Sequence, residues 1–250
     1  MQRDKIIDFA DRYLNSKNIK DASQNGLQFE GVPEVKKIAF GVSASLELIK
    51  EAAAWRADLI IVHHGLLWGK SQPFRGPLKQ KLELLFKSSM SLATWHLPLD
   101  KHPVIGNNAR LLDILAVKKL KPFGTYDGEI IGLSGVLPKP QSAGKIAKTL
   151  SCALWADALC YSFGPASVKT VGVVSGGAQR MFDQAIEAGL DLYVTGEVSE
   201  FVQEMARENK INFIAAGHYN TEKTGIWALE KLLRSKFKVE TLFIDIPNPV

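Results

Sequence analysis

Three short strings carry the residue types that bind divalent metal ions. HLPLD (96–100) and HYNTE (218–222) each place a carboxylate four residues after a histidine, and IVHHG (61–65) contains two adjacent histidines. The chain has five histidines, and four of them lie in these strings. Each string follows or ends an apolar run typical of a strand. His and carboxylate groups at strand ends predict a metal site, because rigid strands aim the ligands and the loops leave an open coordination position.

The number of ligands predicts the number of ions. His63, His64, His218, Asp100 and Glu222 make five candidate metal ligands, which exceeds the usual set for one catalytic zinc and suits two ions that share a carboxylate. Nitrogen and oxygen donors without cysteine suit zinc, manganese or iron(II) and do not choose among them. Two such ions would lower the pKa of a water between them and favour hydroxide near neutral pH.

The adjacent histidines need a local explanation. Neighbouring residues in a regular strand point to opposite faces, so His63 and His64 could not both reach one ion from such a strand. Gly65 follows them directly, and a glycine allows the backbone to turn. We therefore expect both imidazoles to converge where the strand ends.

Two further residues are candidates for catalysis. His96 is a candidate acid/base, a neighbour of the ligands or a substrate contact; direct ligation and a structural role stay open for it. Glu197, which ends the apolar run LDLYVTGE, is a candidate base or a partner of a ligand. The alternative for Glu197 is a solvated carboxylate at a strand end.

The elements that must position these residues follow an α/β pattern. Apolar runs such as 37–44 and 58–64 are continuous, which is typical of strands buried on both faces of a sheet. They alternate with helix-period segments such as 46–56. We therefore expect an α/β fold of two related halves, with mainly parallel or mixed sheets flanked by helices.

An internal repeat underlies the expectation of two halves. Residues 35–64 align without a gap with 168–197, Asp58 falls on Asp191, and each half continues with a helix, a strand and His-x-x-x-carboxylate. The predicted halves are 1–124 and 125–250, joined within KPFGTYDGE (121–129), and residues 218–250 may pack back on the first half. Because Gly196-Glu197 stands where the first half has His63-His64, any site between the halves would be an asymmetric His/carboxylate cluster.

Three smaller motifs have ordinary structural interpretations. SGG (175–177) predicts a tight strand-to-helix turn, with a phosphate cradle as the alternative. Asn107 and Asn108 precede the segment ARLLDIL, which indicates N-capping of a helix. Trp68 is interpreted as a packing residue, with a pocket wall as the alternative.

Composition limits the class of protein. The 46% apolar content is that of an ordinary globular chain, and the net charge of +5 comes from scattered basic residues. We find no basic stripe interleaved with aromatic residues, which argues against a nucleic-acid partner. The charged, amphipathic N-terminus is unlike a signal peptide, and the apolar runs are too short to cross a membrane. A cytoplasmic protein without a membrane partner is expected.

With these residues in view, the chain resembles the Nif-three-like family of dinuclear-metal proteins, also known as GTP cyclohydrolase 1 type 2 homologs. The resemblance covers nearly the whole chain and rests on the blocks SQNGLQFEG, DLIIVHHGLLWG, HLPLD with GNNARLL, LDLYVTGEVSE and AAGHYNTEKTGIWAL. It resembles the short form, without a domain inserted between the halves. Ser199-Glu200 stand where some relatives have further histidines.

The resemblance implies two divalent cations per subunit, held by His63, His64, Asp100, His218 and Glu222. It also implies a homohexamer, a trimer of dimers, with the metal sites facing an internal cavity. The leading hypothesis is a metal-dependent hydrolase that acts on a nucleotide or another phosphorylated heterocycle, GTP cyclohydrolase-like by similarity. The alternative is a non-catalytic metal-handling or adaptor protein.

Overall fold

The structure is a computed structural model that describes residues 1–70 and 72–250. The chain forms two compact units, and neither is a single continuous stretch of sequence. Unit 1 comprises Met1–Leu99 and Ile226–Pro247, and unit 2 comprises Asp100–Gly225 and Asn248–Val250. Helices α4 (Leu97–Lys101) and α9 (His218–Phe237) each contribute residues to both units. The two halves expected from the internal repeat, 1–124 and 125–250, stay a prediction.

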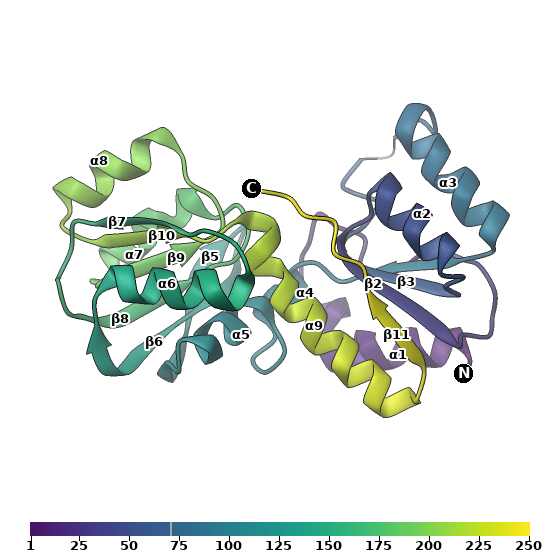
Figure 1. Ribbon diagram of the computed structural model, residues 1–250, viewed down its shortest axis with the longest axis horizontal. Helices are drawn as coiled ribbons and strands as arrows, with labels where there is room; N and C mark the ends of the chain where they lie inside the picture. Colours follow the sequence, from purple (N-terminus) through teal and green to yellow (C-terminus); the bar gives the residue numbers. More distant parts are fainter. Residues whose placement is uncertain (71) are drawn as a thin grey trace. The chain divides into compact units, whose positions relative to one another are not determined.

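Unit 1 contains a mixed five-stranded sheet in the order β1-β4-β3-β2-β11. Strands β2, β3, β4 and β11 are parallel, and β1 is antiparallel to β4. Helices α2 and α3 cover one face, and α1 lies on the other (Figure 1). The bounds are β1 (Gly26–Phe29), β2 (Lys37–Ser43), β3 (Leu59–His64), β4 (Ser91–Thr94), β11 (Glu240–Phe243), α1 (Arg3–Leu14), α2 (Leu46–Ala54), α3 (Gly76–Ser88) and the 3₁₀ turn Ser16–Asn18.

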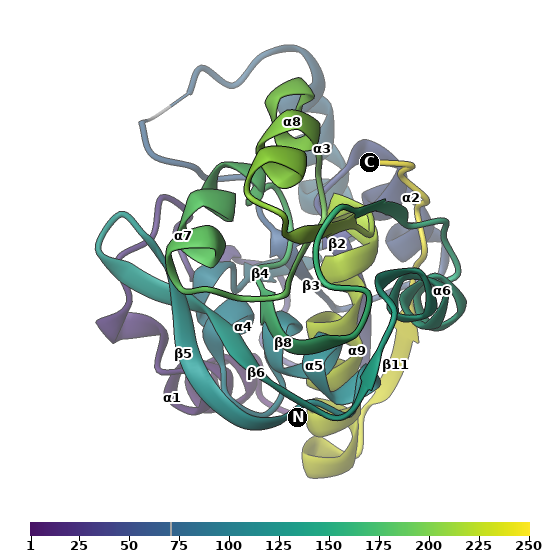
Figure 2. The ribbon, with the colours of Figure 1, turned by 90° about the vertical axis from the view of Figure 1, so that its left-hand side faces the viewer.

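Unit 2 contains a mixed six-stranded sheet in the order β5-β6-β8-β9-β10-β7. Strands β8, β9 and β10 are parallel, and the other pairings are antiparallel. Helices α5 and α6 lie on one side of this sheet and α7 and α8 on the other (Figure 2). The bounds are β5 (Lys118–Tyr126), β6 (Glu129–Gln141), β7 (Leu159–Ser162), β8 (Val168–Val173), β9 (Leu192–Thr195), β10 (Asn212–Ala215), α5 (Asn107–Ile114), α6 (Ala143–Leu154), α7 (Phe182–Glu187), α8 (Glu200–Glu208) and the 3₁₀ turn Gln179–Met181.

The central strands are buried on both faces, as their continuous apolar runs predict. In β3 the neighbouring residues Ile60 and Ile61 are both fully buried, and in β9 so are Tyr193 and Val194. Neighbouring strand residues face opposite sides, so helices must cover both faces of each sheet. The expected α/β architecture, with mixed sheets flanked by helices, is confirmed.

The segment KPFGTYDGE (121–129) is part of a β-hairpin within unit 2. Strands β5 and β6 are antiparallel, and Asp127 and Gly128 at the turn have φ of 48° and 86°. An Asp-Gly pair with both residues at positive φ is the preferred two-residue hairpin turn. Pro122 is tolerated because β5 is an edge strand of the sheet. The predicted boundary at residue 124 falls within this hairpin, and the division of the chain into halves stays a prediction.

The topology brings the chemically important residues to one edge of each sheet. In unit 1, β3 ends at His64 and β4 ends just before Trp95-His96. In unit 2, Glu197 follows the end of β9, and His218 follows the end of β10. Carboxyl ends of parallel strands share an edge, and this edge is where open α/β sheets bind ligands.

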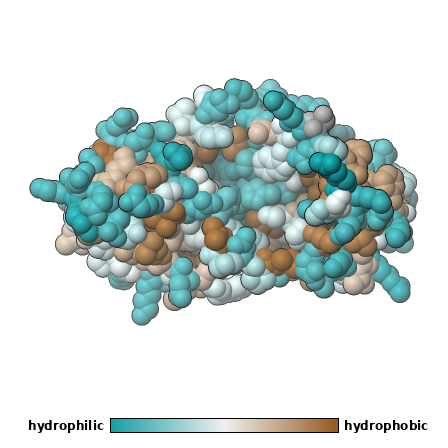
Figure 3. Space-filling view, turned by 90° about the horizontal axis from the view of Figure 1, so that it is seen from above, coloured by the Kyte–Doolittle hydropathy of each residue, from teal (hydrophilic) through white to brown (hydrophobic). Residues whose placement is uncertain are grey.

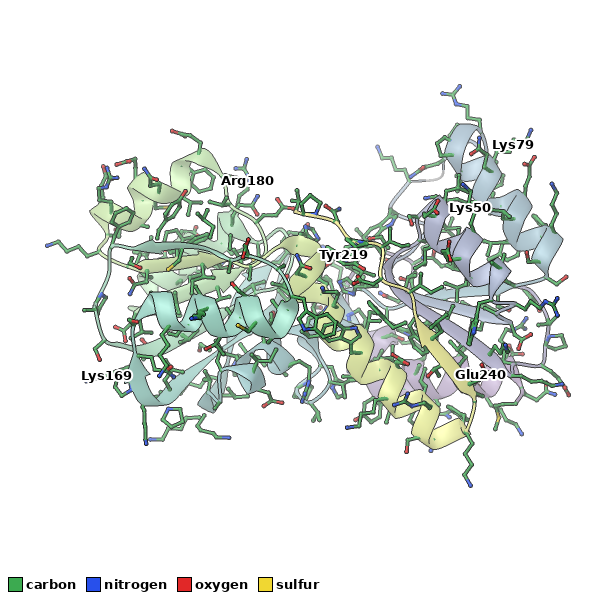
Figure 4. All side chains as sticks on the ribbon, viewed as in Figure 1. Lys50, Lys79, Lys169, Arg180, Tyr219 and Glu240 are labelled. Carbon is green, nitrogen blue, oxygen red and sulfur yellow. The ribbon has the colours of Figure 1, made fainter. Side chains whose placement is uncertain are left out.

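On the face shown in Figure 3, hydrophilic residues predominate and hydrophobic ones form small patches. Lys79 on α3 and Lys169 at the start of β8 project outward in Figure 4. Among the described residues, no helix combines the length and apolar character needed to cross a membrane.

Candidate functional site

Three histidine rings gather at the carboxyl edge of the sheet in unit 1. The ring centroids of His63 and His64 are 4.7 Å apart, and the His96 ring lies 5.0 Å from His63 and 5.6 Å from His64. One ring nitrogen from each histidine lies within 4.8 Å of the others. The adjacent histidines therefore converge as predicted, and His96 joins them.

Hydrogen bonds fix the two adjacent histidines at the end of β3. His63 is fully buried, and its Nδ1 lies 3.0 Å from the carbonyl oxygen of Trp95. Nδ1 of His64 lies 3.0 Å from Oγ of Ser43, its register partner on β2. A Cβ at Gly65 would collide with the side-chain amide of Gln28. A larger residue there would displace the Gln28 amide, which accepts hydrogen bonds from Leu66 N and Leu67 N.

Asp21 holds His96, and sequence reasoning missed it. Its carboxylate side chain is 2% exposed and accepts hydrogen bonds from His96 Nδ1 at 2.9 Å and from Leu97 N at 2.9 Å. Ser23 N and Asn25 Nδ2 also donate to it. Burial favours a higher pKa for Asp21, but the hydrogen bond and charge of His96 outweigh it, so the pKa is lowered. No local signal marks Asp21, because its partner is 75 residues away.

In unit 2, the Asp100 carboxylate is buried and held by two donors. Its Oδ1 accepts from Asn107 Nδ2 at 2.8 Å and from Ser175 Oγ at 3.0 Å. Asn107 also accepts from the backbone N–H of Gly225 on α9, at 2.7 Å. A carboxylate oxygen of Asp100 lies within 4.8 Å of one of Glu222. Asn107 therefore ties Asp100 to the helix that carries Glu222.

The two asparagines are not helix caps. Gly106 occupies the N-cap position of α5, and no side chain caps the helix there. Asn107 and Asn108 are both fully buried. Asn108 donates to the carbonyl oxygens of Asp100 and Ile131 and accepts from Ser175 N. The N-cap prediction was wrong because both side chains bond to distant groups instead.

His218 lies between two carboxylates. Its Nδ1 is 2.6 Å from Glu197 Oε1, and its Nε2 is 3.2 Å from Glu222 Oε1. Burial by itself lowers the pKa of His218, but the hydrogen bonds and charges of Glu222 and Glu197 raise it from 6.5 to about 9. Gln179 Nε2 in turn donates to Glu197 Oε2 at 3.1 Å. The bond to Glu197 fixes the orientation of the His218 ring.

The SGG motif forms a tight turn next to the carboxylates of Glu222 and Glu197. Gly176 has φ of 69°, and a Cβ there would collide with Glu222 Oε1. A Cβ at Gly177 would lie 3.2 Å from Glu197 Oε1. The glycines thus leave space for the candidate ligands, in agreement with the turn interpretation. Ser175 contributes its hydroxyl to Asp100.

The donor sets of both units fit divalent cations. Unit 1 offers imidazole nitrogens, and unit 2 offers the half-buried imidazole of His218 and the two buried carboxylates of Asp100 and Glu222. Mixed nitrogen and oxygen donors are the set that zinc, manganese and iron(II) accept. The hydrogen bonds described above give these donors outer partners that fix their direction, which is a regular feature of metal ligands.

Comparison with known proteins assigns the family. The family model Duf34/NIF3 (NGG1p interacting factor 3) matches residues 1–249. The chain belongs to the Duf34/NIF3 family. This confirms the resemblance drawn from the sequence blocks.

Relatives match this Duf34/NIF3 chain over its full length. GTP cyclohydrolase 1 type 2 homologs from Pyrococcus abyssi and Escherichia coli K12 are 44% and 40% identical, covering 99% and 100% of both chains. The structure of protein ybgI, described as of unknown function, is 38% identical with a TM-score of 0.92, and each chain is fully covered. A crystal structure of a protein from Thermus thermophilus is 35% identical with a TM-score of 0.91, also over both complete chains.

Proposed function

We propose that this Duf34/NIF3 protein binds two divalent cations through His63, His64, Asp100, His218 and Glu222. The observation that carries the proposal is that two buried carboxylates, Asp100 and Glu222, lie within 4.8 Å of each other in unit 2, and that Glu222 Oε1 lies 3.2 Å from Nε2 of the half-buried His218. Buried carboxylates of this kind require a compensating positive charge. His63 and His64 belong to unit 1, and the proposal includes them because the sequence and the family resemblance name them among the five ligands.

We further propose that the protein is a metal-dependent hydrolase of a nucleotide or a related phosphorylated heterocycle. The ions would supply Lewis acidity toward a water molecule and toward a substrate oxygen. The name shared by the relatives, GTP cyclohydrolase 1 type 2 homolog, favours a guanine nucleotide as the first substrate to test.

The chain's own residues have distinct tasks in this proposal. Asn107 and Ser175 hold the Asp100 carboxylate in one orientation, because both donate to the same oxygen. Glu197 holds the His218 ring through Nδ1. His96 presents its ring beside His63 and His64, where it either accepts a proton or acts as a further ligand.

Metal stoichiometry tests the binding step. We expect two zinc or manganese ions per wild-type chain by elemental analysis after dialysis. Glu222→Gln should bind fewer, because the amide removes the negative charge while keeping the shape. Asp113→Asn is a matched control, since Asp113 forms an exposed ion pair with Arg110. A wild-type chain that holds no ion would overturn the proposal.

Turnover tests the reaction. Metal-loaded wild-type protein is incubated with a nucleotide panel that includes GTP, beside Asp100→Asn prepared in the same way. We expect hydrolysis by the wild type and a loss of at least 100-fold in the variant. Equal turnover by both proteins, or none by either with two ions bound, would favour the non-catalytic metal-handling protein.

The family resemblance also leads us to propose self-association into a homohexamer, a trimer of dimers. We propose a cytoplasmic location as well, as the sequence segments led us to expect. Light scattering on the purified full chain tests the assembly. A monomeric mass across the micromolar range would overturn it.

A further inference from the structure

Phe86 on α3 keeps most of its side chain in water. It is 71% exposed, whereas the preceding residue, Leu85, is fully buried in the core of unit 1. Its ring packs edge-on against the ring of Phe29 at the end of β1, with the two centroids 4.8 Å apart. This contact gives an exposed apolar ring a fixed direction. Aromatic side chains of this kind are enriched where proteins contact one another.

A cavity of about 290 Å³ opens beside this ring. Within the described part of the chain, β1 has only β4 as a neighbouring strand, so the cavity lies at an edge of the sheet. Its apolar wall is formed by Phe29, Val32, Leu85 and Phe86, and Glu30 and Ser89 also line it. An apolar cavity of about 150 Å³ already holds a benzene ring. The cavity therefore has room for one phenylalanine side chain.

Charged residues of opposite sign lie on either side of the ring. Glu83 and Lys79 precede Phe86 by three and seven residues, so all three share one face of α3. Glu30 belongs to the cavity, which lies at the C-terminal end of α3, whereas Lys79 lies toward the N-terminal end. The side chains of Lys79 and Glu30 are 64% and 73% exposed. Lys79, Glu83, Phe86 and the cavity with Glu30 together form what we call the Phe86 patch.

We propose that the Phe86 patch is a twofold contact between two copies of this chain. A twofold contact presents the same surface from both copies, so that surface must be complementary to itself. Each copy offers one exposed ring and one cavity with room for the ring of the other. With the two α3 helices antiparallel, Lys79 of one copy also faces the partner's Glu30. The inference rests on the self-association proposed above and adds the surface that forms it.

The charge pattern favours a second copy over a partner of one charge sign. A strongly acidic partner would be repelled by Glu83 and Glu30, and a strongly basic one by Lys79. A surface with both signs in the reverse order matches both ends of the patch, and a copy turned about the twofold axis has that order. Lys79 pairs with Glu83, and Glu30 with Arg3, within the chain. Each of these pairs includes a side chain exposed to solvent, where ion pairs contribute little and leave new pairs open.

Light scattering on the purified full chain tests the surface. Phe86→Glu places a charge in the contact, so the mass of the wild-type assembly should fall by about half, because a twofold contact joins two equal parts. Phe74→Glu is the matched control: Phe74 is 69% exposed but does not line the cavity, so the mass should stay unchanged. Lys79→Glu and Glu30→Lys should each weaken association about 10-fold through facing like charges, and the two together should restore it.

Circular dichroism and metal content separate a change of assembly from a loss of fold. Every variant should keep the wild-type spectrum and metal content, because none of the proposed metal ligands belongs to the Phe86 patch. If Phe86→Glu fails to fold, Phe86→Ser replaces it with the same expectation. An unchanged mass in the Phe86 variant, an equal fall in Phe74→Glu, or no recovery in the combined charge variant would overturn the surface and leave the metal proposal standing. A monomeric wild type would overturn the surface together with self-association.

Discussion

At the residue scale, the candidate ligands depend on partners that fix their charge and direction. His218 is the clearest case, because Glu197 and Glu222 engage both ring nitrogens. Asp100 depends on Asn107 and Ser175 in the same way. Two consequences can be measured on the metal-free protein and on single variants.

The His218 ion pairs should make the stability of metal-free protein depend on pH. The pKa of His218 is raised from 6.5 to about 9, so the pairs stabilise the fold fully below pH 6.5. That stabilisation, up to about 3 kcal/mol, is lost as the pH rises toward 9. Urea unfolding of chelator-treated protein at pH 6 and at pH 9 measures it. The difference should shrink in His218→Gln; an identical difference in both proteins would contradict the assignment.

A side chain at Gly176 should lower both the stability of the fold and the metal affinity. At φ of 69°, alanine costs about 1 kcal/mol in backbone strain, and here its Cβ also displaces Glu222. Gly189 is a matched control, because its φ is 62° and a Cβ there meets open space. We expect Gly176→Ala to lose more stability than Gly189→Ala in urea unfolding, and to lose metal affinity as well. If the two variants lose the same stability and the same metal affinity, the predicted effect of the collision with Glu222 is contradicted.

At the element scale, the two units contain the same hydrogen-bonding contact at Asp58 and Asp191, which the sequence alignment pairs. Asp58 Oδ2 accepts from the backbone N–H groups of Lys36 and Lys37, and Asp191 Oδ2 accepts from those of Lys169 and Thr170. In each unit this aspartate directly precedes one parallel strand, and its carboxylate accepts hydrogen bonds from the start of the adjacent strand. The duplication stays a prediction, and the matching contacts support it.

Removing either aspartate should therefore have a similar effect. Asp58→Ala and Asp191→Ala each leave two backbone donors without their carboxylate, which costs about 1–3 kcal/mol. Asp113→Ala is the control, because it removes an exposed ion pair worth about 0–1 kcal/mol. Urea unfolding at pH 7 measures all three. A loss of stability in only one of the two aspartate variants would count against equivalent roles for Asp58 and Asp191.

At the scale of the whole molecule, each compact unit takes its residues from separated stretches of sequence. Unit 1 includes Ile226–Pro247 in addition to the first 99 residues, so β11 pairs with β2 across nearly the whole chain length. Folding of unit 1 thus requires the C-terminal part of the chain. A ligand that binds only the folded chain raises its free energy of unfolding by mass action.

Metal should raise the melting temperature of the full chain. At a free ion concentration 100 times the dissociation constant, binding adds about 2.7 kcal/mol. For a chain of this size this corresponds to roughly 5–10 °C. Differential scanning calorimetry with zinc and with chelator measures the shift, which should be smaller in Glu222→Gln. An unchanged melting temperature would contradict binding to the folded state.

Local patterns in the sequence were enough to predict the α/β class, the buried strands and the candidate ligands. Continuous apolar runs indicate doubly covered strands, and His63, His64, His218, Asp100 and Glu222 stand beside their ends because topology places functional groups there. The convergence of His63 and His64 could be expected from their place at the end of a strand. These features depend on neighbours within a few residues.

Tertiary structure decided which residues support the ligands. Asp21 contacts His96, and Asn107 links Asp100 to Gly225, over separations of 75 and 118 residues. Hydrogen bonds of this kind have no period and no fixed spacing, so a sequence pattern cannot reveal them. They form only when separate loops are brought to the same sheet edge, because buried polar groups then satisfy one another. The N-cap prediction for Asn107 and Asn108 was wrong for the same reason. In the sequence they stand directly before a helical segment, as capping residues do, but in the structure their side chains bond to groups elsewhere in the chain.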